Sequence, residues 1–152
     1  EAEELERLRA ERMGLESRIT ETLPYEVCLP AAGQGALGIQ CRAGDAARNI
    51  AALLDSHWTR VCVLAERALL ERLEGGCQVP IAALGREENG QIRLEAAVAA
   101  LDGSSVVRKS AVGDVSSPEA LGGRLADELL ISPAKDLLQA ARAAAPKNMG
   151  AA

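Results

Sequence analysis

The sequence contains almost no aromatic residues. Phenylalanine is absent, and one Trp and one Tyr are the only aromatic side chains among 152 residues. Apolar residues nevertheless make up 48% of the chain and charged residues 26%, a mixture typical of a globular protein rather than a disordered one. The core must therefore be aliphatic, built from Ala, Leu, Val and Ile.

Long apolar runs are also missing. No stretch approaches the roughly 20 consecutive apolar residues that a membrane-spanning helix needs, so we expect no membrane partner. The first residues are charged and carry no apolar signal-peptide region, which favours a cytoplasmic protein. The sequence starts without Met in a Glu- and Arg-rich helical pattern, and we expect it to be a piece of a longer protein.

Metal ligands and basic clusters are scarce. His57 is the only histidine, and the four cysteines have no C-x-x-C spacing, so a zinc site lacks ligands. Without a secretory signal, free thiols are favoured over disulfides. The net charge of −5, with no basic run and no set of stacking aromatics, argues against nucleic-acid binding.

Helix and loop signals alternate in the first third of the chain. Residues 1–22 have apolar residues at helical spacing, and Gly14 is expected to break this segment into two short helices. Three glycines at residues 33–38 and the alternating apolar residues that follow them predict a tight loop feeding a strand over residues 37–41. No helix follows these glycines, so a dinucleotide-binding loop is not supported.

Further along, capping residues predict the helices. Asp45 is expected to begin a helix over residues 46–54, with Ile50, Leu53 and Leu54 buried. Thr59 is expected to begin a helix over residues 60–74 that buries Cys62 as a small hydrophobic residue and ends at Gly75-Gly76. Two Ser-Pro pairs, in which a capping hydroxyl precedes a proline, predict helices over residues 118–130 and 133–144.

The pattern between these helices changes to a period of two. Residues 79–84, 91–100 and 104–112 read as three strands, joined through turns that contain Asn-Gly and Asp-Gly. We therefore predict an α+β fold over residues 44–146, with a three-stranded antiparallel sheet covered on one face by helices. Residues 1–43 would be the end of the preceding domains, a helical segment plus a strand that returns to a neighbouring α/β domain. Residues 147–152 would be a loose tail.

Cys77 is the cysteine whose position stands out. It follows the Gly-Gly pair that ends a predicted helix and precedes a predicted strand, so a bulky group could reach its sulfur. On position alone, a small residue at a tight crossing is an equally good interpretation. The negative end of the helix dipole lies there, so nothing indicates an activated thiolate.

Three runs of residues resemble those of one family. They are LPAAGQGALGIQCR at residues 29–42, AERA at residues 65–68 and LEGGCQVPIA at residues 73–82. In order and spacing they are similar to porphobilinogen deaminase, also called hydroxymethylbilane synthase. The resemblance runs over nearly the whole chain and corresponds to the C-terminal portion of that enzyme.

The resemblance implies a transferase of tetrapyrrole and heme biosynthesis. The family joins four porphobilinogen units head to tail, releases ammonia at each step and hydrolyses off a linear tetrapyrrole. Growth is primed on a dipyrromethane cofactor, held by a thioether to the cysteine that corresponds to Cys77. Gln34, Gly35 and Ala36 correspond to a loop near the cofactor and the reacting pyrroles. Arg42 corresponds to an arginine that contacts acetate or propionate groups, a pairing for which a guanidinium is well shaped.

The resemblance also implies that part of the enzyme is missing. The family's catalytic aspartate and most of its carboxylate-binding arginines lie in the earlier half, so no catalytic residue is assigned here. The expected partners are porphobilinogen, the pyrrole-chain intermediates and the N-terminal half of the same enzyme, and the chain alone would be inactive. Glu66 and Arg67 also match the family, but a charged residue inside an apolar helix more often anchors a domain contact than performs catalysis.

Two other functions stay open. The first is a non-catalytic α+β module that kept the fold and serves in binding or interaction. The second is thiol redox chemistry at Cys77, which lacks a resolving cysteine at close spacing.

Overall fold

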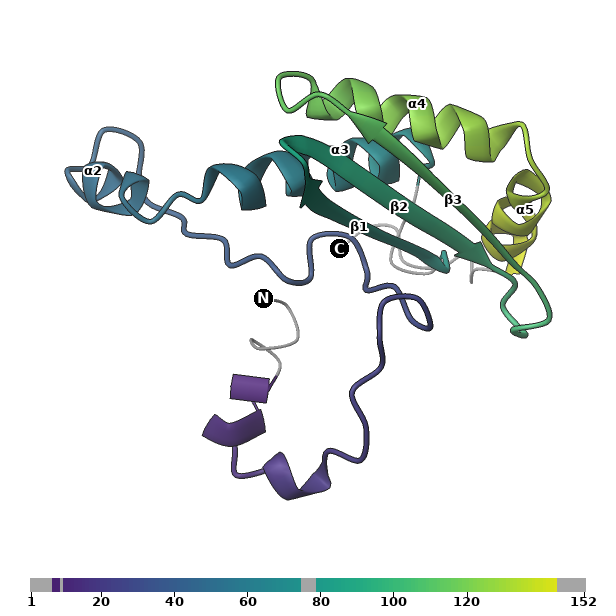
Figure 1. Ribbon diagram of the computed structural model, residues 1–152, viewed down its shortest axis with the longest axis horizontal. Coiled ribbons are helices and arrows are strands. Elements are labelled where there is room, and N and C mark those ends of the chain that lie inside the picture. Colours follow the sequence, from purple (N-terminus) through teal and green to yellow (C-terminus); the bar gives the residue numbers. More distant parts are fainter. Residues whose placement is uncertain (1–6, 9, 75–78, 145–152) are drawn as a thin grey trace, which may run out of the picture.

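The computed structural model describes residues 7–8, 10–74 and 79–144 (Figure 1). The predicted loose tail at residues 147–152 and the predicted stop at Gly75-Gly76 therefore lie outside the described residues. Along the chain, the elements are η1 (Glu16–Arg18), α2 (Ala47–Ala52), α3 (His57–Arg72), β1 (Ile81–Glu88), β2 (Gln91–Ala99), β3 (Val106–Gly113), α4 (Pro118–Leu130) and α5 (Ala134–Ala144).

The three strands form one antiparallel sheet in the order β1-β2-β3. The turn between β1 and β2 consists of Asn89 and Gly90, both with positive φ (53° and 77°), which is the geometry that an Asn-Gly turn provides. Gly103 has a φ of 74° in the second turn. The antiparallel meander predicted from the sequence is therefore confirmed.

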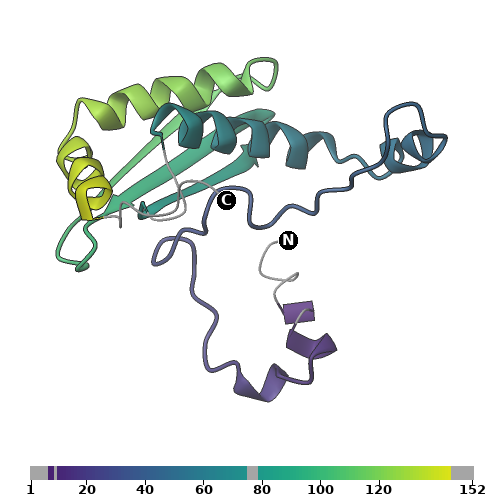
Figure 2. The same cartoon turned by 180° about the vertical axis from the view of Figure 1, so that it is seen from behind.

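The helices lie on one face of this sheet. Along β2, Ile92, Leu94, Ala96 and Val98 are fully buried and belong to the same core as α3, α4 and α5. The intervening residues of β2 point to the opposite face, as the period of two requires. From behind, α3 and α4 lie across the sheet and α5 lies at one end of it (Figure 2). The predicted α+β fold with one helix-covered face is thus confirmed.

A glycine brings α3 and α4 close together. A Cβ atom at Gly122 of α4 would lie 2.2 Å from the carbonyl oxygen of Ala65 and 2.8 Å from the backbone nitrogen of Leu69 on α3. No side chain fits at that distance, so the absence of a Cβ sets how closely the two helices approach. A Cβ at the neighbouring Gly123 would meet nothing within 4 Å.

The residues that cap α3 and α4 differ from the predicted ones. α3 begins at His57 rather than at residue 60, because Ser56 and not Thr59 caps it: the Ser56 hydroxyl accepts from the Thr59 amide and from the Thr59 hydroxyl. Ser132 caps α5 as predicted, since its hydroxyl accepts from the Ala134 amide. Ser117 makes no side-chain cap bond at α4, so its predicted role is wrong.

The first third of the chain is an extended segment beside the domain. Gly14 has a φ of 66° and ends the short helix at residues 10–12, so the predicted break is confirmed. The predicted strand over residues 37–41 is wrong, and Leu37 and Ile39 are 71% and 59% exposed. A strand needs a neighbour to accept its backbone hydrogen bonds, and this segment has none among the described residues.

α2 is present but not packed. It spans residues 47–52 rather than the predicted 46–54, and its N-cap position is Ala46, although Asp45 accepts a hydrogen bond from the Ala47 amide. Ile50, Leu53 and Leu54 were expected to be buried and are instead exposed, because α2 lies beyond the end of α3 and away from the sheet (Figure 1). Within the described residues, every helix is too short or too polar to cross a bilayer.

Candidate functional site

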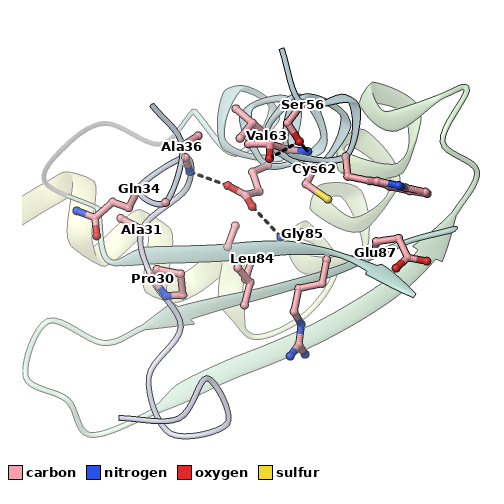
Figure 3. Close-up of a pocket in the computed structure, with 17 residues that line it drawn as sticks. Pro30, Ala31, Gln34, Ala36, Ser56, Cys62, Val63, Leu84, Gly85 and Glu87 are labelled. Atoms are coloured by element: carbon pink, nitrogen blue, oxygen red, sulfur yellow. Dashed lines mark hydrogen bonds between the residues drawn. The ribbon is translucent and has the colours of Figure 1, made fainter. Parts of the chain in front are cut away.

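A cavity of about 450 Å³ lies between the loop at residues 33–36, here called the glycine-rich loop, and the elements α3 and β1 (Figure 3). The loop contributes Gln34, Gly35 and Ala36, three of the residues predicted to lie near a cofactor. α3 contributes Trp58, Cys62 and Glu66, and β1 contributes Gly85, Arg86 and Glu87. The structure thus brings the predicted loop residues against the α+β domain.

Glu66 joins the two sides of this cavity. Its side chain lies on α3 and is only 5% exposed. One carboxylate oxygen accepts a hydrogen bond of 2.6 Å from the Gly33 amide, and the other accepts one of 2.7 Å from the Gly85 amide. Burial raises the pKa of this carboxyl above its ordinary value, and the two backbone hydrogen bonds together with Arg67 oppose that shift. The charged residue that was expected to anchor a contact does so.

The free edge of β1 is covered by this arrangement. The amide of Ala83 donates to the Pro30 carbonyl, and the amide of Gly85, two residues later, donates to Glu66. The outward-pointing amides of an edge strand otherwise lack partners. Residues 30–33 therefore run along β1 where a fourth strand would lie.

Gly85 is a site residue that the sequence argument missed. A Cβ on Gly85 would lie 2.9 Å from the Cβ of Cys62, so only glycine lets β1 approach α3 here. A glycine in the middle of a strand often marks such a close approach, and this was the available signal. Cys62 is buried, as predicted for a small hydrophobic residue, and burial together with the nearby Glu66 and Glu87 raises the pKa of its thiol to about 11.

Cys77 lies outside the described residues, but both ends of its loop are described. At the end of α3, Arg142 of α5 donates to the carbonyl of Leu73 and lies 3.5 Å from the carboxylate of Glu74. Glu74 has a φ of 49°, the left-handed conformation common just after a helix. On the other side, Val79 packs against the hydrophobic core. The loop therefore starts and ends at fixed points of the domain.

Arg42 is not part of the cavity. It is exposed, and within the described chain its one hydrogen bond is backbone to backbone, from the Asp45 amide to its carbonyl. Arg67 is likewise exposed and lines a second, neighbouring hollow with Gly35 and Ala36. The structure thus brings together residues 34–36 and leaves Arg42 apart from them.

A cluster of charges lies on the face of the sheet opposite the helices. Arg86, Arg93 and Arg108 surround the carboxylate of Glu95 at 2.7, 3.2 and 3.5 Å. Burial would raise the pKa of Glu95, but hydrogen bonds from Arg93 and Arg86 hold it below its ordinary value. Arg108 also donates to the carbonyls of residues 25 and 26, so the cluster fixes the preceding segment on this face.

Comparison with known proteins gives one consistent family. Residues 60–131 match the model described as the C-terminal domain of porphobilinogen deaminase, and residues 9–49 match the model described as its dipyrromethane cofactor binding domain. The porphobilinogen deaminase of Desulforudis audaxviator is 51% identical over 135 residues, which is 88% of this chain and 44% of the relative. That of Pelotomaculum thermopropionicum is 45% identical over 132 residues, 86% of this chain and 42% of the relative.

These matches divide the predicted site between two models. Gln34, Gly35, Ala36 and Arg42 fall in the residues matched by the model named for the cofactor, whereas Cys77 falls in the residues matched by the C-terminal domain. At the level of the family, the predicted dipyrromethane cofactor is confirmed. The chain spans less than half the length of the curated relatives. The two models and both relatives agree over most of its residues, so the chain belongs to the porphobilinogen deaminase family.

Proposed function

We propose that the chain is the C-terminal portion of a hydroxymethylbilane synthase and carries the dipyrromethane cofactor as a thioether on Cys77. Such an enzyme polymerises four porphobilinogen units into a linear tetrapyrrole with release of ammonia. The observation that carries this proposal is the run Glu-Gly-Gly-Cys, which begins where α3 ends, in a chain of this family. A soft sulfur suits the task, because it can trap an electrophilic pyrrole methylene and hold it through many turnovers.

The described ends of the Cys77 loop support a positional role. Arg142 donates to the carbonyl of Leu73, just after α3, and Val79 packs against the core. Fixed points on either side of Cys77 would return a chain attached to its sulfur to the same region at every step, and such preorganisation lowers the entropy lost in reaching the reactive geometry. When bound, the cofactor supplies the pyrrole to which the first substrate is joined.

The remaining predicted residues have distinct proposed roles. Gln34, Gly35 and Ala36 would contact the cofactor and the reacting pyrroles through backbone amides and the Gln amide, from the loop that lines the cavity. Arg42 would pair with acetate or propionate groups of the growing chain, and its exposed position leaves its guanidinium accessible.

The chain is further proposed to act only with the N-terminal half of the enzyme. Residues 1–43 would belong with the preceding domains and residues 44–146 would form the cofactor-bearing domain. Exposed apolar side chains such as Leu37 and Ile39 support this division, because burial against another part of the protein would stabilise them. A substrate chain with two carboxylates per pyrrole also needs a more positive cleft than a chain of net charge −5 provides.

Intact mass tests the attachment. The chain is purified after co-expression with the N-terminal half of the Desulforudis audaxviator relative, and we expect the mass of a two-pyrrole adduct on it. Cys77→Ala should lose the adduct, and the matched control Cys41→Ala, which replaces an exposed cysteine, should keep it.

The alternative function is a non-catalytic binding module. An unmodified Cys77 after co-expression would favour that module. The need for the other half is tested separately: the isolated chain should form no tetrapyrrole from porphobilinogen, and sustained production by it alone would refute this part of the proposal.

A further inference from the structure

Glu66 is a buried charged residue in an otherwise apolar part of α3. It is the buried charged residue of the described chain, on a helix whose other buried residues are apolar or cysteine. The raised pKa of its carboxyl means that burial of the charge is only partly offset by the surrounding hydrogen bonds. A buried charge is by itself weak evidence for a stabilising role, so the contacts of the carboxylate show what this residue does.

What the carboxylate does achieve is a connection between two distant segments. Its two oxygens accept from amides that lie 33 residues before it and 19 residues after it, at Gly33 and Gly85. In Figure 3, the labelled Gly85 lies on β1, and the labelled Gln34 and Ala36 lie on the loop that follows Gly33. An apolar side chain of the same size would fill the space but accept neither hydrogen bond.

Both partner positions are shaped for this contact. Gly33 has a φ of 74°, a conformation that L side chains rarely adopt, and its amide meets the carboxylate from there. Gly85 lets β1 approach α3 to a distance that excludes any Cβ. The loop, the helix and the strand therefore converge on the carboxylate of Glu66.

We propose that Glu66 is a positioning residue: its carboxylate holds the glycine-rich loop at residues 33–36 at a fixed place relative to the domain that carries Cys77. Because the loop and Cys77 belong to different segments, this contact would set the distance between the loop and a chain growing on the sulfur. The catalytic part of this inference rests on the proposed function, whereas the positioning of the loop by Glu66 does not.

Nuclear magnetic resonance of the chain tests directly whether Glu66 positions the loop. In the native chain, the chemical shifts of the Gly33 and Gly85 amide protons should change with pH around one shared midpoint above the ordinary pKa of glutamate, because they report on the same carboxyl. Separate midpoints, or no titration of either amide, would refute the shared carboxylate.

Few other charged groups face this carboxyl. On α3 these are Cys62, whose thiol pKa of about 11 keeps it protonated at acidic and neutral pH, and Arg67. On β1, Glu87 lines the cavity, whereas the guanidinium of Arg86 pairs with Glu95 on the opposite face of the sheet. Residues 30–36 carry no ionisable side chain. On α4, two charged residues are engaged elsewhere, Arg124 with the carbonyl of Val112 and Asp127 with Arg72.

A shape-preserving substitution separates positioning from stability. In Glu66→Met, hydrogen exchange of the amides at residues 33–36 should accelerate about tenfold or more, because both hydrogen-bond acceptors are lost. Exchange of the β2 amides should stay close to native, because the apolar side chain still fills the site. Glu66→Gln keeps one acceptor and should be intermediate, and Glu71→Gln, at an exposed position on the same helix, should behave as native. Unchanged exchange in the loop, or equal acceleration in β2, would overturn the proposal.

An activity measurement then tests the catalytic part. With the N-terminal half of the Desulforudis audaxviator relative supplied, Glu66→Met should still load the cofactor, as judged by mass, while kcat falls about tenfold or more relative to Glu71→Gln. A loosened loop with native kcat would refute the catalytic role. If the native chain is inactive together with the N-terminal half, the proposed function fails. The hydrogen-exchange experiment still decides whether Glu66 positions the loop.

Discussion

The chain combines two regions that are both rich in apolar residues but differ in how far these side chains are exposed. Residues 57–74 and 79–144 build the core, in which Leu69, Leu94 and Leu125 have no exposed surface. Residues 10–54 expose most of their apolar side chains: Leu53 is 84% exposed, and Leu29 is the buried large apolar residue of this described segment. The difference is that the first region has a sheet on which helices can pack, whereas the second has no such surface within the described chain. Amphipathic sequence therefore specifies burial only where a second layer is present.

A matched pair of leucine substitutions should sharpen this contrast most. Leu69→Ala removes a fully buried side chain from α3 and should lower the free energy of unfolding by about 2–5 kcal/mol, because it combines lost burial with a cavity. Leu53→Ala on α2 should change it by less than about 0.5 kcal/mol. Urea denaturation of both variants measures the difference. Equal losses would mean that α2 is packed in solution.

A pair of glycine substitutions on α4 should give the next largest effect. Gly122→Ala places a methyl group against the backbone of α3 and should destabilise the domain by about 1–3 kcal/mol. Gly123→Ala meets open space and should stabilise the helix by about 0.5–1 kcal/mol, because alanine is the better helix former. Thermal unfolding followed by circular dichroism compares them, and a Gly122→Ala variant as stable as Gly123→Ala would contradict the close packing of α3 and α4.

The smallest effect concerns the thiol of Cys62 and pH. Its folded-state pKa of about 11 lies above the ordinary value of 9.0, so the folded protein holds this proton more tightly than the unfolded chain does. The corresponding stability is complete below about pH 9 and should be lost as the pH rises toward 11. Cys62→Ala should remove this contribution, so its unfolding midpoint should fall less between pH 8 and pH 11 than that of the control Cys41→Ala. Parallel falls in the two variants would count against burial of the thiol.

Most of the packed region could be predicted from the sequence. The Asn-Gly turn, the alternation along β2 and the proline at the start of α4 are local signals, and each led to the element that is observed. The start of α3 was misplaced because Ser56 and Thr59 both satisfy the preference for a capping hydroxyl. Their hydrogen bonds, not their residue types, decide which one caps the helix.

The extended region could be predicted far less well. The alternation at Leu37 and Ile39 is a valid strand signal, but a strand exists only when a neighbour pairs with it. The loop at residues 33–36 was identified as a candidate site, whereas Gly85, on the opposite side of the cavity, was not. Its role depends on the distance between β1 and α3, which no local pattern contains.

The sequence by itself determined the family, the α+β class of the packed region and the expectation that a charge within α3 anchors a contact, because motifs and periodicity are properties of consecutive residues. Only the tertiary structure decided which atoms that charge contacts. Gly33 and Gly85 are 52 residues apart in the chain, and both amides reach Glu66 because the loop runs along the free edge of β1 while β1 packs closely on α3.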